Sequence, residues 1–395
     1  MTRKIIHLDL DAFFCAVEAL KDPSLQGKAF AVGGRPEYRG VIASCSYPAR
    51  KYGVRSAMPT ARALQLCPEL ILLPGHHSDY RDYSEKVMAQ LDNLTSLIEQ
   101  ISIDEAFLDV SDLRAPAAQI ASELQRVIWE QLSLPCSLGV ATNKLVAKIA
   151  NDVGKSSART GKPPMAITVV PPGEEAGFMS NLPIERLWGV GPKTAAELTS
   201  TLGIATIGEL ARWPPADLER RFGRHGVDLS LRARGIDDRP VTPEHDVKSI
   251  SHETTFATDV VDGDELRRTL YRLAEDVGRR LRRAQLAGAT VKLKLRWSDF
   301  TTLTRQATLP EPTDRDAVIC QVALELLSAN RPQGKPVRLI GVGVSNLRSP
   351  SEQLHLWDDA SVKSKRLQEA LDRVRERYGR DAIQRATQLE RDDDD

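Results

Sequence analysis

Residues 8–18 read LDLDAFFCAVE and follow directly on the apolar run KIIH. Alternate residues of a strand point to the same face of a sheet, so Asp9 and Asp11 would repel each other unless a positive charge lay nearby. Acids at a strand end are commonly solvated or cap the next helix, and a short DxD pattern alone favours that reading. The stretch predicts a strand over RKIIHLDLD and a helix over FFCAVEAL.

The composition is typical of a soluble globular protein. The chain has 395 residues, of which 27% are charged and 41% are apolar, and this length suggests roughly two to four domains. Lys+Arg and Asp+Glu balance at 54 each, so net charge does not point to a nucleic-acid partner. Residues 248–348, however, hold seventeen Lys/Arg against twelve Asp/Glu, and residues 349–395 hold nine against twelve. A basic module followed by an acidic tail is expected.

Cysteine usage and the N-terminus bear on the compartment. The cysteines are odd in number, scattered and never at CxxC spacing, which argues against a disulfide framework and against a zinc site: Cys15, Cys45, Cys67, Cys136 and Cys320. The N-terminus turns polar too early for a signal peptide, and no apolar run approaches the length of a membrane span. We therefore expect a soluble cytoplasmic protein without a membrane segment.

The first part of the chain is predicted to mix short strands and helices. Strands are expected at KAFAVGG, GVIASCSY and CSLGVA, and two more at 98–103 and 106–110, on either side of Asp104 and Glu105. Helices are expected at about 77–97, 116–132 and 142–153, the last with Thr142 as N-cap and Gly154 beyond its end.

The second part of the chain begins at a Pro-rich stretch, 163–183. Short helices run from there to about 236, and GIDDRPVTPEHD reads as a linker. The order that follows is βαββαβ, a two-layer sandwich with strands at 249–257, 289–298, 301–309 and 336–346 and helices at 264–286 and 314–329.

The strand TVKLKLRW within this module has two different faces. Apolar residues alternate with cations, so one face is expected to pack on the helices while the other presents Lys292, Lys294 and Arg296. Like charges at such spacing repel one another without an anionic partner. The preceding helix is expected to bury Leu266, Leu270, Leu273, Val277 and Leu281.

A second acidic site is SIDEAFLD, where Asp104 and Glu105 lie between two strands. Their side chains could project from the same edge as Asp9 if the strands were neighbours. Converging carboxylates are costly unless cations bind or some of the acids stay protonated. Oxygen ligands suit Mg²⁺ or Mn²⁺, and two ions about 3.5–4 Å apart can clamp an in-line phosphoryl displacement. An Asp-Glu pair in a hairpin turn is also ordinary structure.

A phosphate-contacting set lies between the two acidic sites. SYPARKYG offers hydroxyls and cations at Ser44, Tyr47, Arg50 and Lys51, and Lys155 could add a point charge. LWGVGPKTAAEL carries Gly189 and Gly191 before Pro192 at a helix start, where exposed amides can hold a phosphate. Each of these residues alone is more often a surface side chain or part of a plain helical hairpin.

Taken together and in order, these motifs resemble the Y-family DNA polymerases, in their DinB (polymerase IV-type) branch. The resemblance runs from about residue 3 to 346 and is carried by HLDLDAFFCAVE, SYPARKYGVRSAMP, SIDEAFLDV, GVATNKLVAKIANDVGK, LWGVGPKTA and KSISHETTF. It implies an α+β multidomain fold, a right-hand polymerase with a βαββαβ little finger. The implied parts are palm 1–20 and 77–165, fingers 21–76, thumb 166–236 with a helix-hairpin-helix, linker 237–247, little finger 248–348 and tail 349–395.

The resemblance also implies roles for single residues. Asp9, Asp104 and Glu105 match the catalytic metal ligands for two Mg²⁺ ions, with Mn²⁺ as a possible substitute, and the carbonyl of Leu10 matches a further ligand. Ser44, Tyr47, Arg50 and Lys155 match dNTP contacts, and Phe14 matches the steric gate that excludes a 2′-hydroxyl. Phe13 lies beside this gate and is grouped with the nucleotide contacts, although it is expected to pack inward. Expected primer–template DNA contacts are Gly189, Gly191, Lys193, Lys248, Lys292, Lys294, Arg296 and Arg305.

Two stretches depart from the family pattern. After Lys155 the family usually runs on as KPNG, whereas this chain has KSSARTGKPP. EQLHLWDD resembles the family's sliding-clamp-binding peptide, with Trp357 in place of Phe, and implies anchors at Gln353, Leu354, Leu356 and Trp357. A further amphipathic helix is expected at roughly 361–378. Asp11 receives no role from the resemblance and is expected to be a structural hydrogen-bond acceptor.

The resulting expectation is a template-directed, error-prone translesion polymerase. No segment is left for a proofreading domain of ordinary size, and we expect a monomer in a bacterial-type cytoplasm, associated with the nucleoid. A two-metal nuclease would also need clustered acids, but it would need neither the triphosphate contacts nor the gate. A non-catalytic DNA- or clamp-binding protein would not need both acidic sites.

Overall fold

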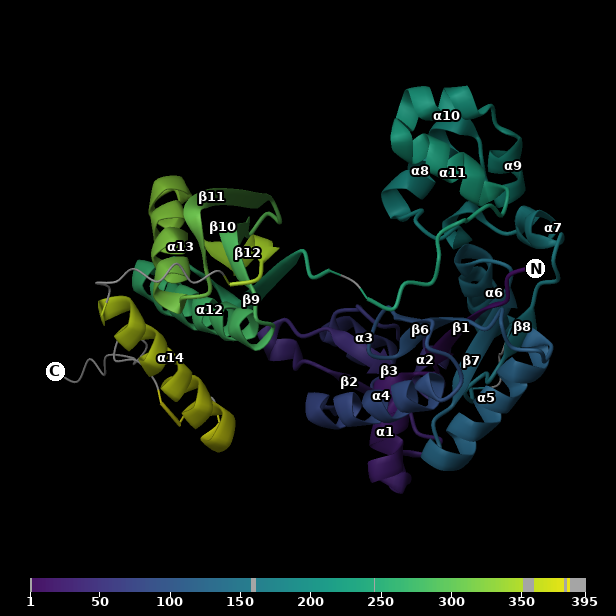
Figure 1. Ribbon diagram of the computed structural model, residues 1–395, viewed down its shortest axis with the longest axis horizontal. Helices are drawn as coiled ribbons and strands as arrows, with labels where there is room; N and C mark the ends of the chain where they lie inside the picture. Colours follow the sequence, from purple (N-terminus) through teal and green to yellow (C-terminus); the bar gives the residue numbers. More distant parts are fainter. Residues whose placement is uncertain (1, 158–160, 245, 351–358, 380–381, 384–395) are drawn as a thin grey trace. The chain divides into compact units, whose positions relative to one another are not determined.

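The computed structural model describes residues 2–157, 161–244, 246–350, 359–379 and 382–383 (Figure 1). The chain divides into two compact units, Met1–Pro36 with Gly40–His245, and Glu37–Arg39 with Asp246–Asp395. The main division falls inside the segment 237–247 that was expected to be a linker. None of the described helices is both long and apolar enough to cross a membrane.

The first unit is built on a five-stranded sheet in the order β5-β6-β1-β7-β8. Its strands are β1 (Ile5–Leu10), β5 (Ile98–Gln100), β6 (Glu105–Asp109), β7 (Cys136–Ala141) and β8 (Ile167–Val169). The central strand β1 pairs antiparallel with both β6 and β7. The expected palm boundary at 165 is therefore too early, because β8 pairs with β7 and extends this sheet to Val169.

Helices cover both faces of this sheet, and the alternation along β1 decides which residue faces which helix. Ile6, Leu8 and Leu10 belong to the core formed with α1 (Phe13–Lys21), α4 (His77–Asp92) and α5 (Ala117–Leu132). Ile5 belongs to the core formed with α6 (Lys144–Ser157) on the other side. Because side chains alternate, His7 and Asp9 share the α6 face with Ile5. The acids of LDLD therefore lie on the face that the helix α6 covers.

Two smaller modules complete the first unit. A three-stranded sheet, β3-β2-β4, has its own core and consists of β2 (Phe30–Gly33), β3 (Ile42–Cys45) and β4 (Ile71–Leu73), with α2 (Tyr47–Lys51) and α3 (Thr60–Leu66). Five short helices, which share a core with α6, are α7 (Glu175–Ser180), α8 (Pro192–Leu202), α9 (Ile207–Arg212), α10 (Pro215–Phe222) and α11 (Arg224–Ala233).

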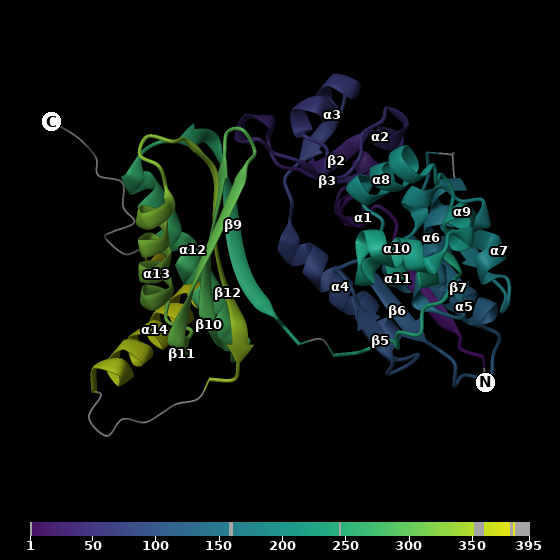
Figure 2. The ribbon, with the colours of Figure 1, turned by 90° about the horizontal axis from the view of Figure 1, so that it is seen from above.

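The second unit has the expected βαββαβ order. It contains β9 (Ser249–Val260), α12 (Gly263–Arg283), β10 (Ala287–Trp297), β11 (Thr302–Thr313), α13 (Asp316–Asn330) and β12 (Val337–Arg348). The antiparallel sheet has the order β11-β10-β12-β9, and Figure 2 shows both helices on one side of it. The apolar residues of β10 are buried, and so are the helix residues expected to be: Leu266, Leu270, Leu273, Val277 and Leu281.

The helix α14 (Asp359–Tyr378) confirms the helix expected near 361–378 and packs on the helical layer of the second unit. Arg282 of α12 donates to Asp372 at 2.6 Å and to Asp316 at 2.7 Å. Arg375 of α14 is buried and lies 3.1 Å from Glu275. The helix that sequence reasoning left without a role is thus part of this unit.

The helix α6 differs from the prediction at both ends. The Asn143 side chain, rather than Thr142, caps it by accepting from the Val146 amide at 3.0 Å. Its C-terminal end lies beyond Gly154, because this glycine makes room for β8: a Cβ there would lie 2.3 Å from the Thr168 hydroxyl. Lys155 is therefore inside the helix and its side chain has a fixed direction.

Gly139 of β7 lets α6 approach the sheet closely. A Cβ at this position would lie 1.9 Å from the Ala147 carbonyl oxygen and 2.6 Å from the Asn151 amide, both on α6. We expect Gly139→Ala to lower the free energy of unfolding by about 3 kcal/mol, because backbone has to move. Chemical denaturation measures this, with Gly177→Ala as control, since a Cβ at that helical position meets nothing within 4 Å. Equal stability of the two variants would contradict the close approach.

All five cysteines are buried and free, in agreement with the absence of a disulfide framework. Burial raises the pKa of Cys15 to about 12 and also raises the pKa values of Cys45 and Cys136. Cys15 and Cys136 lie in the core of the five-stranded sheet, Cys45 and Cys67 in that of the small sheet, and Cys320 in that of the second unit.

Candidate active site

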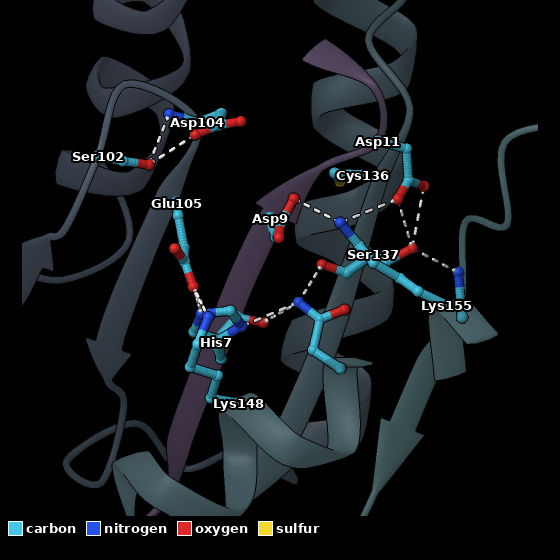
Figure 3. A network of polar contacts seen from close by, with 12 residues as sticks. His7, Asp9, Asp11, Ser102, Asp104, Glu105, Cys136, Ser137, Lys148 and Lys155 are labelled. Atoms are coloured by element: carbon cyan, nitrogen blue, oxygen red, sulfur yellow. Dashed lines mark hydrogen bonds and ion pairs between the residues drawn. The ribbon is translucent and has the colours of Figure 1, made fainter. Parts of the chain in front are cut away.

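The predicted carboxylates lie at one end of the β1–β6 pair. Asp9 of β1 is the register partner of Glu105, the first residue of β6. The Leu10 amide donates to the Asp104 carbonyl at 2.9 Å, which holds the Asp104 loop against the end of β1. Antiparallel pairing thus brings together residues almost one hundred positions apart, as the sequence suggested (Figure 3).

Each of these carboxylates has a protein partner of its own. Within the described residues no three His, Cys, Asp or Glu side chains stand close enough to hold an ion as they are. Asp9 pairs with Lys155, Glu105 pairs with His7 and Lys148, and Asp104 accepts from the Ser102 hydroxyl at 2.6 Å. The acids thus lie at one end of the β1–β6 pair, each with a basic or hydroxyl partner of its own.

Asp104 carries an electrostatic cost that a cation would remove. Burial, together with the negative charges of Asp9 and Glu105, raises the pKa of Asp104. A divalent cation between these oxygens would stabilise the ionised form, and hard cations such as Mg²⁺ prefer oxygen ligands. The donor set therefore fits the expected ions.

Lys155 supplies the positive charge that Asp9 and Asp11 required. Its ammonium group pairs with Asp9 and lies 3.3 Å from an oxygen of Asp11. Although burial works against the charge, the two carboxylates raise the pKa of Lys155. The repulsion expected between Asp9 and Asp11 is thus balanced by a residue of α6.

Asp11 is a structural acceptor, as expected. Asp11 is 1% exposed, and its side chain accepts from the Ser137 hydroxyl at 2.9 Å and from the Met165 amide at 3.0 Å. Burial raises the pKa of Asp11. These bonds tie the end of β1 to β7 and to the segment before β8.

Glu105 is held in its ionised form. His7 Nε2 lies 2.5 Å from Glu105 Oε1, and Lys148 of α6 donates to the same oxygen. Against the effect of burial, these partners lower the pKa of Glu105 to about 2. Burial lowers the pKa of His7, so the imidazole is the neutral partner.

Sequence reasoning missed His7, Lys148 and Asn151. Asn151 Nδ2 lies 2.9 Å from His7 Nδ1, so His7 has a polar partner on each nitrogen. A sequence signal existed, because Lys148, Asn151 and Lys155 are spaced three and four apart and therefore share one helix face.

The predicted triphosphate contacts lie close to these acids. Tyr47 and Ser44 are buried, and the Arg50 guanidinium lies 4.5 Å from the centre of the Tyr47 ring. Burial, followed by the charge of Asp11, raises the pKa of Tyr47. Tyr47 of the three-stranded module therefore reaches Asp11 at the end of β1, beside Lys155.

The two aromatics after LDLDA separate as expected. Phe13 is 2% exposed and belongs to the core, so its grouping with the nucleotide contacts does not fit its burial. Phe14 is half-buried and stacks on Tyr80, with ring centres 4.1 Å apart and planes at 10°. Tyr80 is fully buried and donates to Glu18 at 2.5 Å, which fixes the ring behind Phe14.

The predicted DNA contacts fall into two groups. Gly189, Gly191 and Lys193 lie at the start of α8, where Gly189 has a φ of 98° and Pro192 begins the helix as expected. In the second unit Lys292 is exposed, whereas Lys294 donates to Glu253 at 2.6 Å and Arg296 to Thr302 at 2.9 Å. Lys248 precedes β9, and Arg305 donates to Asn330 at 3.1 Å.

The row of cations predicted on β10, Lys292, Lys294 and Arg296, is therefore partly neutralised within the protein, because Lys294 pairs with Glu253.

The predicted clamp-binding residues Gln353, Leu354, Leu356 and Trp357 lie outside the described residues.

Comparisons with known proteins agree along most of the chain. Family models match at residues 8–152 (impB/mucB/samB family), 172–204 (IMS family HHH motif) and 247–356 (impB/mucB/samB family C-terminal domain). A DNA polymerase IV of Dehalococcoides mccartyi (strain CBDB1) is 40% identical over 386 residues, covering 97% of this chain and 96% of its own. A DNA polymerase IV of Listeria monocytogenes serotype 4b (strain F2365) is 42% identical over 350 residues, covering 88% and 96%.

A solved structure is similar as well. A Y-family DNA polymerase chimera superposes with a TM-score of 0.77 at 25% identity, covering 88% of this chain and 100% of that chain.

Proposed function

The chain belongs to the impB/mucB/samB family, that is, to the Y-family of DNA polymerases, and we propose that it is a translesion DNA polymerase without proofreading. It adds dNMP from a dNTP to a primer 3′-hydroxyl as the template directs. The observation that carries the proposal is the end of the β1–β6 pair, where Asp9 lies opposite Glu105 and beside Asp104. The nuclease and scaffold readings lack support from the named relatives.

Two divalent cations, Mg²⁺ or Mn²⁺, would be held by Asp9, Asp104, Glu105 and the Leu10 carbonyl. When bound, they would supply Lewis-acid stabilisation of the attacking and leaving oxygens. Tyr47, Arg50 and Lys155 bind the triphosphate, with Ser44 beside them, and Phe14 packs under the sugar. Lys155, which pairs with Asp9 here, would be available to the phosphate oxygens when bound cations take over the charge of Asp9.

The proposed division of labour follows the modules. The five-stranded sheet forms the palm, the three-stranded module the fingers and the helices α7–α11 the thumb, whose α8 turn contacts the DNA backbone. The sheet of the second unit forms the little finger, and its exposed cations, Lys292 above all, contact phosphates. We propose that the protein acts as a monomer in a bacterial cytoplasm, because its free cysteines suit a reducing compartment.

Primer extension by the purified protein tests the proposal. Each dNTP is supplied singly on plain templates and on templates with a damaged base, and product length is read on a gel. Template-directed addition opposite both kinds of base is expected. Degradation of the primer without dNTP-dependent growth would favour the nuclease instead.

The clamp peptide gives a separate prediction. Replacing Leu356 and Trp357 by Ala is expected to leave extension on a bare primer unchanged and to remove stimulation by a bacterial sliding clamp, because apolar anchors carry such binding. Substitution is preferable to truncation, since truncation would also remove α14, and with it Asp372 and Arg375, the partners of Arg282 and Glu275.

His355→Ala, which changes a residue between the anchors, is the matched control for this variant. Equal stimulation of the double variant and of the unchanged protein would contradict the role of the peptide.

A further inference from the structure

A buried histidine outside the predicted sites contacts the carboxylate of Glu105, one of the predicted metal ligands. His7 is fully buried on the α6 face of β1, and its ring lies 4.7 Å from that of Phe107. Its Nε2 lies 2.5 Å from Glu105 Oε1, the oxygen that also accepts from Lys148. The described side-chain hydrogen bonds of Glu105 thus fall on one of its two carboxylate oxygens.

The protonation of His7 follows from its other neighbour. Asn151 Nδ2 donates to the Ser137 carbonyl at 3.0 Å and lies 2.9 Å from His7 Nδ1. An amide nitrogen can only donate, so Nδ1 accepts and the ring hydrogen lies on Nε2. The neutral imidazole therefore donates to Glu105. The order of donors runs from Asn151 to His7 to Glu105, along one face of β1.

We propose that His7 is a positioning residue: it holds Oε1 of Glu105 so that Oε2 is presented to the divalent cation. This inference rests on the proposed role of Glu105 as a ligand. A carboxylate with one oxygen anchored loses side-chain freedom before the cation arrives, and outer partners of ligands commonly govern affinity in this way. Lys148 places a positive charge beside Glu105, whereas His7 orients the Glu105 carboxylate, since the His7 ring is held by Phe107 and Asn151.

Two amide substitutions test the donor. The nitrogen of a Gln side chain can take the place of Nε2 and still reach Glu105, whereas Asn has polar atoms only near the place of Nδ1. We expect His7→Asn to weaken Mn²⁺ binding about tenfold and His7→Gln to stay within about threefold of the unchanged protein. Binding is read by electron paramagnetic resonance on the complex with dNTP and a dideoxy-terminated primer–template, in which no reaction occurs.

Steady-state kinetics give an independent readout. We expect kcat to fall for His7→Asn with a nearly unchanged KM for dNTP, because Tyr47, Arg50 and Lys155 are untouched. His7→Gln should recover most of kcat. If both amides weaken Mn²⁺ binding equally, or if neither does, the positioning role is wrong.

Glu105→Gln, measured in the same way, distinguishes a failure of this inference from a failure of the proposed role of Glu105 as a ligand. Normal Mn²⁺ binding and extension by that variant would overturn the role of Glu105 itself. Weak binding by Glu105→Gln together with normal binding by His7→Asn would overturn only the role of His7. In the unchanged protein, the ¹⁵N signals of His7 should show hydrogen on Nε2, and hydrogen on Nδ1 would contradict the proposal even if the variants fail to fold.

Discussion

Asp104→Ala abolishes primer extension while primer–template binding is retained. We expect kcat to fall at least about 1,000-fold, because losing a ligand removes several kcal/mol of transition-state stabilisation. Asp104 is half-buried on a loop and its described side-chain partner is Ser102, so the substitution leaves the core intact. Burial and neighbouring acids already raise its pKa, which means that the folded protein gains nothing from this charge without a cation.

Single-turnover extension with saturating dNTP measures this loss, and fluorescence anisotropy of labelled primer–template measures binding. Asp112→Ala is the matched control, because it removes an exposed acid a short distance along the same chain segment. Extension by Asp104→Ala at a rate close to that of the control would show that the site has been assigned wrongly.

Phe14→Ala opens the site to ribonucleotides. We expect the ratio of kcat/KM for a dNTP over the matching rNTP to fall about 100-fold. The substitution removes a rigidly supported ring and leaves room for the 2′-hydroxyl. The ring is backed by Tyr80, which is fully buried, stacked at 4.1 Å and held by Glu18. Steric exclusion at this position thus depends on a rigid support.

Phe14→Tyr keeps the ring and serves as control, with selectivity expected to remain high. Both variants are compared on one template with single dNTP and rNTP additions. If sugar selectivity is the same for Phe14→Ala and for the unchanged protein, the gate lies elsewhere.

Helices and strands were predicted well where the regular spacing of apolar residues determines them. Alternation in TVKLKLRW gave the buried face of β10, and the apolar positions of α12 gave the core of the second unit. The role of LDLD could be anticipated because an antiparallel neighbour brings Glu105 opposite Asp9. The resemblance to a family supplied the roles of single residues, which the spacing of apolar residues alone left open.

Other features depend on contacts that a single segment does not encode. The end of α6 was predicted one turn too early, because Gly154 reads as a stop signal until Thr168 of β8 is placed beside it. Asn151 and His7 are 144 positions apart, and their contact exists only once α6 lies on β1. The docking of α14 depends on ion pairs such as Arg282 with Asp372, whose partners lie in separate helices.

Because the cysteines are buried, thiol labelling can measure local opening of the protein without any introduced probe. A thiol reagent reaches a buried sulfur only when the surrounding core exposes it, so labelling rates report the free energy of that opening. Cys15 and Cys136 report on the five-stranded sheet, Cys45 and Cys67 on the small module, and Cys320 on the second unit. Mass spectrometry of labelled peptides would thus rank the modules by stability in one unmodified chain, with and without DNA.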